Sequence, residues 1–151
     1  MAKLTTVDEI LDFAIDQEQK AVDFYLKLAA QADSPATAAV FEEYAQEELG
    51  HKAKILAVKA GKQLAGSAET VKDLQIGDYL VGVKADGNLS YQDALILAMK
   101  REKAAFRLYT ELAGRTDNEN MKNLFLQLAQ EEAKHKLRFE LEYDEQILKD
   151  N

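Results

Sequence analysis

An internal repeat is the feature of this sequence that most restricts its fold. When the chain is shifted by 84 positions, residues 6–52 align with residues 90–136 without a gap, and 15 of the 47 aligned pairs are identical. Many of these identities are three or four positions apart, which is the spacing of one face of an α-helix. They include Leu11/Leu95, Ala14/Ala98, Glu18/Glu102, Ala21/Ala105, Tyr25/Tyr109, Leu28/Leu112, Phe41/Phe125, Ala45/Ala129, Glu47/Glu131, Glu48/Glu132 and His51/His135. Each half is therefore predicted to form a pair of helices.

Capping residues predict where these helices begin. Thr6 with Glu9, and Ser90 with Asp93, have the spacing of a capping box or its close analogue. Ser34 precedes a proline, the residue best tolerated at the first position of a helix, and this second helix is expected to end near Gly61. The third helix is expected over 90–114 and the fourth over 118–147. Short links make each pair an antiparallel hairpin.

A long segment, 61–89, separates the two halves and contains five of the seven glycines. It is too long for a hairpin turn, so we expect a crossover between the second and third helices, with a short helix over 71–81. The alternative is a flexible linker between two small domains, but a lone helical hairpin buries little surface. We therefore predict one all-α domain over 1–151, a four-helix bundle with hairpin repeats at about 6–60 and 90–148.

Composition restricts the chemistry that the chain can perform. A formal net charge of -8 disfavours binding to nucleic acid or to an anionic membrane surface. The absence of cysteine leaves carboxylate and imidazole as the strong metal ligands. No apolar run has membrane-spanning length and the first residues lack the apolar core of a signal peptide, so a cytoplasmic location is expected.

Each predicted helix carries an acidic residue in the middle of its apolar stripe, and two of the helices also carry a histidine there. The stripes are Leu11, Ala14, Glu18, Ala21, Tyr25, Leu28 in the first helix and Leu95, Ala98, Glu102, Ala105, Tyr109, Leu112 in the third. They are Phe41, Tyr44, Glu48, His51, Ile55, Val58 in the second helix and Phe125, Leu128, Glu132, His135, Phe139 in the fourth.

Four carboxylates facing one another in a bundle core would be strongly destabilising without a counter-charge. Two divalent cations neutralise four carboxylates, and two neutral imidazoles supply nitrogen ligands. Both histidines of the chain follow a glutamate by three positions, a spacing that places both side chains on one side of a helix. The predicted metal ligands are Glu18, Glu48, His51, Glu102, Glu132 and His135.

Other residues of the chain adjoin the predicted ligands and either compete with them or support them. Ala21 and Ala105 follow the stripe glutamates of their helices and leave room beside them, although alanine is also a good helix former. Glu47 and Glu131 are the rival ligands, but they fall off the stripes and are interpreted as solvated or as supporting the ligands. Tyr25 and Tyr109 either hydrogen-bond a ligand carboxylate or pack in the core, and the sequence does not separate these alternatives.

These motifs resemble those of the rubrerythrin branch of the ferritin-like superfamily, over almost the whole chain. The matching segments are Glu18-x-x-Ala-x-x-Phe-Tyr25, Glu48-x-x-His51, Glu102-x-x-Ala-x-x-Leu-Tyr109 and Glu132-x-x-His135. The resemblance implies a ferritin-like bundle holding two iron ions, with Glu48 and Glu132 as bridges. It implies terminal positions for the other four ligands, Glu18, Glu102, His51 and His135.

The resemblance also implies reduction of hydrogen peroxide with electrons from a separate donor protein. Two departures limit it, because Ala105 stands where typical rubrerythrins have a further glutamate, and because the Cys-rich electron-transfer domain is missing. We expect a di-iron peroxidase that acts on peroxide or dioxygen, in a homodimer. The alternatives are a ferroxidase or iron-storage protein, and a non-catalytic metal-binding bundle that holds manganese or zinc.

Overall fold

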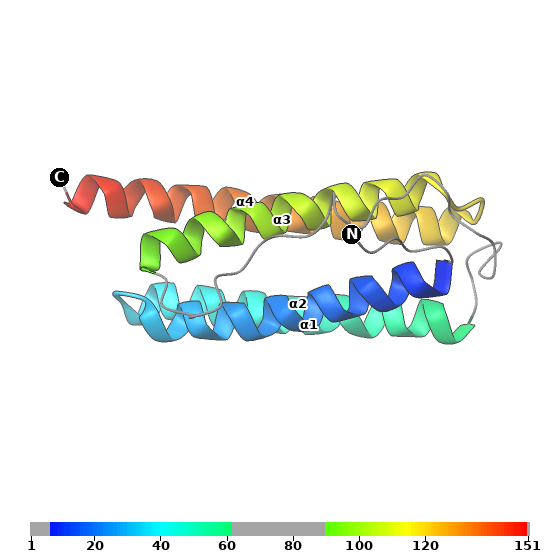
Figure 1. The fold of residues 1–151 in the computed structure, drawn as a ribbon, viewed down its shortest axis with the longest axis horizontal. Coiled ribbons are helices and arrows are strands. Elements are labelled where there is room, and N and C mark those ends of the chain that lie inside the picture. The colour runs from blue at the N-terminus through cyan, green and yellow to red at the C-terminus, as the bar shows by residue number, and fades with distance from the viewer. Residues whose placement is uncertain (1–6, 62–89, 151) are drawn as a thin grey trace.

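The computed structural model describes residues 7–61 and 90–150, which form four α-helices. They are α1 (Val7–Gln31), α2 (Pro35–Gly61), α3 (Tyr91–Gly114) and α4 (Glu119–Asp150). α1 packs against α2 and α3 packs against α4 in two antiparallel hairpins, which form the lower and upper layers of Figure 1. Contacts of α1 with α3 and of α2 with α4 join the hairpins into one bundle. The predicted all-α four-helix fold is confirmed.

The helix starts within the described ranges follow from side-chain caps. The Ser34 hydroxyl accepts a hydrogen bond from the backbone N–H of Thr37 at 3.1 Å, and α2 begins at Pro35. The Ser90 hydroxyl caps α3 in the same way, accepting from the N–H of Asp93 at 3.1 Å. These bonds satisfy backbone donors that the first turn of a helix leaves without partners. α4 starts as predicted and continues to Asp150, beyond the expected end near 147.

Three of the sequence predictions fall on residues that the structure does not describe. The cap at Thr6 is one of them, and the short helix over 71–81 is another. The predicted crossover over 61–89 lies outside the described residues except for Gly61, the last residue of α2. The assignment of 1–151 to one domain stays a prediction. Of the helices in the described ranges, none is both long enough and apolar enough to cross a bilayer.

Two apolar clusters form the core, and each receives side chains from all four helices. The first contains Ile10, Leu11, Ala14, Ile55, Val58, Leu108, Tyr109, Leu112, Ala113, Met121, Phe125, Leu128 and Ala129. The second contains Ala21, Val22, Tyr25, Leu28, Phe41, Ala45, Ala94, Leu95, Ala98 and Phe139. In every helix, the cluster residues on one side of the stripe glutamate belong to one cluster, and those on the other side belong to the second cluster. Two stripe residues, Tyr44 and Ala105, are only partly buried.

Candidate metal centre

The six predicted ligands meet in the middle of the bundle, between the two apolar clusters. Each of these six residues is at most 2% exposed. They form two groups, and within each group one ligand atom per residue lies within 4.8 Å of all the others. The groups are Glu18, Glu48, His51, Glu132 and Glu48, Glu102, Glu132, His135. Glu48 and Glu132 belong to both groups, so the structure brings together two adjoining sets of four ligands.

Each histidine turns its Nδ1 atom toward the buried carboxylates. His51 Nδ1 lies 3.1 Å from Glu18 Oε2, 3.2 Å from Glu48 Oε1 and 3.3 Å from Glu132 Oε1. His135 Nδ1 lies 3.5 Å from an oxygen of Glu48, 3.7 Å from Glu102 and 3.8 Å from Glu132. Both rings therefore present the same nitrogen to the place where the carboxylate oxygens converge.

The Nε2 atoms of the two histidines face Glu131 and Glu47. Each of these comes one position before a stripe glutamate in the sequence. His51 Nε2 lies 2.8 Å from Glu131 Oε2, and His135 Nε2 lies 3.4 Å from Glu47 Oε1. Each of these bonds joins α2 to α4. The side chains of Glu131 and Glu47 are 29% and 39% exposed, so their charges are partly solvated. A carboxylate on the outer nitrogen of a ligand histidine fixes the tautomer and the orientation of the ring.

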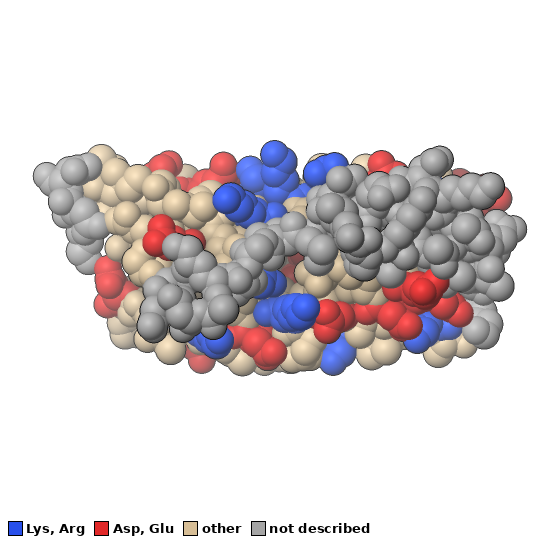
Figure 2. All heavy atoms as spheres, viewed as in Figure 1, with Lys and Arg blue, Asp and Glu red and all other residues tan. Residues whose placement is uncertain are grey.

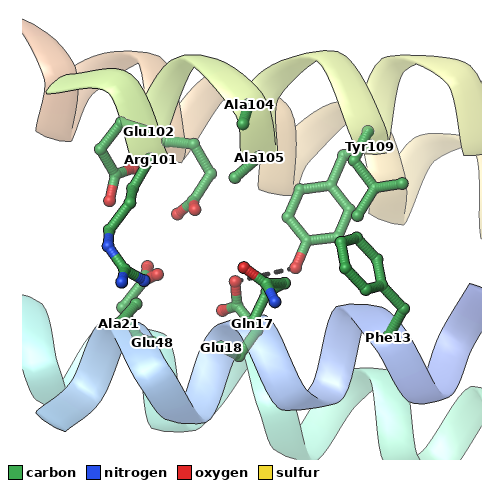
Figure 3. Close-up of a pocket in the computed structure, with 12 residues that line it drawn as sticks. Phe13, Gln17, Glu18, Ala21, Glu48, Arg101, Glu102, Ala104, Ala105 and Tyr109 are labelled. Carbon is green, nitrogen blue, oxygen red and sulfur yellow. Dashed lines mark hydrogen bonds between the residues drawn. The ribbon is translucent and has the colours of Figure 1, made fainter. Parts of the chain in front are cut away.

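The two stripe tyrosines differ, although the repeat makes them equivalent. The Tyr109 hydroxyl donates a hydrogen bond to Glu18 Oε1 at 2.9 Å, the bond drawn as a dashed line in Figure 3. The Tyr25 hydroxyl is buried and makes no hydrogen bond with the described residues. Its ring packs edge-on against His135, with the centroids 6.2 Å apart. Tyr109 thus holds a carboxylate of the site, whereas Tyr25 acts as a core aromatic residue.

Burial governs the protonation of the cluster when no cation is bound. It is the largest cause that raises the pKa of Glu18 from 4.5 to about 7 and that of Glu132 to about 8, with neighbouring carboxylates adding to it. The same causes raise the pKa values of Glu48 and Glu102 well above their ordinary value. Burial lowers the pKa of His51, but contacts with Glu132, Glu18 and Glu48 outweigh burial and raise it.

Several atoms of the predicted ligands are buried without a hydrogen-bond partner among the described residues. These atoms are both carboxylate oxygens of Glu48, one of Glu102, one of Glu132, and Nδ1 of His135. Unpaired polar atoms in a core are costly, and here they converge on a common volume. Carboxylate oxygens and imidazole nitrogens are good ligands for divalent iron, manganese or zinc. The donor set and its unpaired atoms therefore fit two divalent cations.

A small cavity reaches the cluster from the side where α1 and α3 face each other. Its volume is about 30 Å³, and all four stripe glutamates contribute to its lining. Partly exposed residues at its outer side include Phe13, Gln17, Arg101 and Ala104. Figure 3 shows Arg101 extending from α3 toward α1 beside the glutamates. The histidines do not line this cavity.

Sequence reasoning missed Arg101 and left the partners of the histidines undecided. The spacing of Glu47 and Glu131, four positions before each histidine, marked them as rivals, but their bonds cross from one hairpin to the other. Nothing in the spacing of Arg101 sets it apart from the other basic residues of its helix. Its position became apparent only from the cavity that it lines.

The fold and this site define the chain as an all-α bundle with carboxylate and imidazole side chains clustered in its core. Comparisons with known proteins find the same fold elsewhere. The rubrerythrin family model matches residues 9–143. A structure from Thermotoga maritima, described as a ferritin-like diiron-carboxylate protein, superposes with a TM-score of 0.83 at 19% identity, covering 97% of this chain and 99% of that one. At this identity the likeness concerns the fold alone.

Two further solved structures have the same fold. A hypothetical protein from Pyrococcus furiosus gives a TM-score of 0.72 at 26% identity, covering 92% of this chain and 89% of that one. An uncharacterized conserved protein from Magnetospirillum magnetotacticum MS-1 gives 0.65 at 24% identity, covering 93% and 95%. No significant match is found among curated proteins. On the extent of the family match, the chain belongs to the rubrerythrin family.

Proposed function

We propose that this chain binds two iron ions and reduces hydrogen peroxide, or dioxygen, with electrons from a separate donor. The observation that carries the proposal is the sharing of Glu48 and Glu132 by two buried groups of four ligands. Two ions that share two carboxylates are held as a pair, and the remaining ligands divide evenly between them. Two ferrous ions supply the two electrons that cleavage of one O–O bond requires.

The side chains of the chain have distinct tasks in this proposal. Glu48 and Glu132 would be shared by the two ions, while Glu18 with His51 and Glu102 with His135 would complete the two ligand sets. Tyr109 keeps Glu18 in place through its hydrogen bond, and Glu131 orients His51. The apolar clusters on both sides lower the local dielectric around the ligands, which strengthens the electrostatic attraction between carboxylate and cation.

The reaction also requires a source of electrons and of protons. One hydrogen peroxide takes up two electrons and two protons and yields two water molecules. The sequence contains no cysteine that could hold an iron–sulfur or rubredoxin-type centre, so we assign the electrons to a separate protein. A homodimer in the cytoplasm that binds neither nucleic acid nor membrane completes the proposal, in keeping with the acidic net charge of -8.

Elemental analysis of anaerobically purified protein tests the site first. We expect about two irons per chain in the native protein, and loss of metal in Glu48→Ala and His135→Ala variants. Glu42, an exposed glutamate of α2, provides the control variant Glu42→Ala, which should keep its metal. Rapid optical changes on adding peroxide to the reduced protein, followed by donor-dependent turnover, would support the peroxidase assignment. A reduced iron-loaded protein that peroxide does not oxidise would overturn it.

The same preparations separate the alternatives. Stoichiometric manganese or zinc in place of iron would favour a non-catalytic bundle. Size-exclusion chromatography that gives a dimer would support the proposal, whereas a large iron-filled assembly would favour storage. Oxidation of added ferrous ions by dioxygen, without turnover of peroxide, would favour a ferroxidase.

A further inference from the structure

The cavity between α1 and α3 has a size suited to a very small ligand. A cavity needs roughly 10–15 Å³ to accept one water molecule. The volume of about 30 Å³ therefore admits about two groups of that size, which is the size of a molecule with two oxygen atoms. The walls next to the acids include Ala21 and Ala105, whose short side chains leave this space open.

Arg101 is the cavity residue that has an unused hydrogen-bond donor. Its Nε–H is buried and has no hydrogen-bond partner among the described residues. The guanidinium carbon lies 5.2 Å from the centre of the Phe24 ring, a cation–π contact that uses none of the N–H donors. The buried Nε–H has given up its hydrogen bonds to water without gaining another among the described residues, which costs free energy. A ligand with an acceptor oxygen or a negative charge would offset that cost.

Charge also favours an electron-rich ligand at this position. Among the described residues that line the cavity, Arg101 is the one cation. Once two divalent ions balance the four carboxylates, its positive charge remains without a counter-charge in the lining. Figure 2 shows Lys and Arg side chains gathered near the middle of the upper hairpin on this face. Lys100 and Arg107 are exposed basic residues of the same stretch of α3, in a chain whose net charge is -8.

We propose that Arg101 positions the peroxide substrate in this cavity by donating a hydrogen bond from its guanidinium group to a peroxide oxygen. This inference rests on the proposed function and names a substrate-positioning residue for it. The ligand class is a small molecule or anion of two or three non-hydrogen atoms with an acceptor at one end. A guanidinium suits this task because it stays charged and its donors are arranged in a fixed plane.

Azide binding to the oxidised, iron-loaded protein tests the inference without relying on turnover. Azide is a small anion whose binding is followed optically. We expect its dissociation constant to rise by about tenfold or more in Arg101→Gln and in Arg101→Met, because each loses a charge-assisted hydrogen bond. Arg101→Lys should recover part of the affinity, since it keeps the charge but not the planar donors. Lys103→Gln removes an exposed charge from the same helix and should change the affinity by about twofold or less.

Peroxide kinetics provide the second measurement. In Arg101→Gln we expect KM for peroxide to rise by about tenfold with a smaller change in kcat, while the iron content stays at the wild-type level. Arg101→Met keeps an unbranched apolar side chain beside Phe24, so it remains informative if Arg101→Gln loads iron poorly. Absence of azide binding in the wild-type protein would overturn the inference. It would also be overturned if Arg101→Gln and Arg101→Met bound azide as tightly as Lys103→Gln.

These outcomes distinguish the inference from the proposed function. Azide binding that depends on Arg101, in a protein that does not turn over peroxide, would uphold an anion site at Arg101 and reject the peroxidase. Peroxide turnover with the same KM in all Arg101 variants would uphold the peroxidase and reject the role of Arg101.

Discussion

His51 on α2 and Glu131 on α4 form a hydrogen bond across the two hairpins, with Nε2 and Oε2 2.8 Å apart. The opposite nitrogen of the same ring faces three buried carboxylates, so Glu131 determines which side of the ring the site receives. The repeat-related bond between His135 and Glu47 is longer, at 3.4 Å. The histidine of one half of the site, His51, is therefore held by a shorter hydrogen bond than the histidine of the other half, His135.

Replacing Glu131 should weaken metal binding more than replacing Glu47. We expect Glu131→Ala to lower the affinity for ferrous iron by about tenfold or more, because the His51 ring loses its orienting partner. Glu47→Ala should have a smaller effect, since its bond is longer and its side chain is more exposed. Competition with a chelator of known affinity measures both. Equal losses of iron affinity in the two variants would contradict this prediction, because the shorter hydrogen bond would then support metal binding no more than the longer one.

The two stripe tyrosines should respond differently to loss of the hydroxyl group. Tyr109→Phe removes the donor to Glu18 in a buried site and should lower the free energy of unfolding of the metal-free protein by about 1–3 kcal/mol. Tyr25→Phe removes a buried hydroxyl without a partner among the described residues, so it should be neutral or slightly stabilising. Denaturant unfolding of both variants provides the comparison. A larger loss in Tyr25→Phe would contradict this assignment.

The raised pKa values of the buried carboxyl groups predict that the metal-free protein loses stability as the pH rises. In the folded state the pKa of Glu18 is raised from 4.5 to about 7, and that of Glu132 to about 8. A carboxyl whose pKa is raised by folding holds its proton more tightly in the folded than in the unfolded state. The free energy of unfolding should therefore decrease between about pH 4.5 and about pH 8. Thermal unfolding in the presence of a chelator, at several pH values across this window, measures the effect.

His51 should reinforce this trend, and metal should reverse it. The raised pKa of His51 contributes stability that is complete below its unfolded value of 6.5 and is lost as the pH rises. Metal binding needs deprotonated ligands, so the stabilisation by added ferrous iron should increase with pH over the same window. A metal-free protein whose stability stays constant or increases from pH 5 to pH 8 would refute the role of the buried acids.

Replacing one buried acid should stabilise the metal-free fold while removing part of the metal site. Glu102 is 1% exposed and has a carboxylate oxygen that makes no hydrogen bond with the described residues. Methionine has a similar shape and no charge, so Glu102→Met should raise the metal-free stability by about 1–3 kcal/mol. The bound iron should fall from about two ions to about one. Glu111→Met, at an exposed position of the same helix, is the matched control and should change stability by less than about 0.5 kcal/mol.

The helices and their polar centre could be predicted from the sequence because they depend on local spacing. Ser34 and Ser90 cap the helices that they were predicted to cap, since a cap needs only a backbone N–H within three residues. The stripe glutamates and both histidines were assigned to the core from helical periodicity, and all of them are buried. The family resemblance drawn from the same motifs is confirmed by the family match over 9–143. Their action as metal ligands stays a prediction.

Contacts between helices could not be read from the same spacing. Tyr25 and Tyr109 occupy equivalent positions of the repeat, yet only Tyr109 reaches a glutamate of the neighbouring hairpin. Periodicity placed Tyr44 and Ala105 fully on the buried face, whereas both are partly exposed. The pairing of His51 with Glu131 was likewise open, because it joins residues on two helices of different hairpins.

The sequence by itself therefore determined the four helices, the caps at Ser34 and Ser90, and the set of acidic and imidazole side chains that faces the core. Only the tertiary structure decided which nitrogen of each histidine faces the carboxylates, which tyrosine bonds to Glu18, and that Arg101 lines the cavity. The physical reason is that a helical repeat fixes the direction of a side chain relative to its own helix axis. The rotation and separation of neighbouring helices come from the packing of the whole core, and they decide which side chains meet.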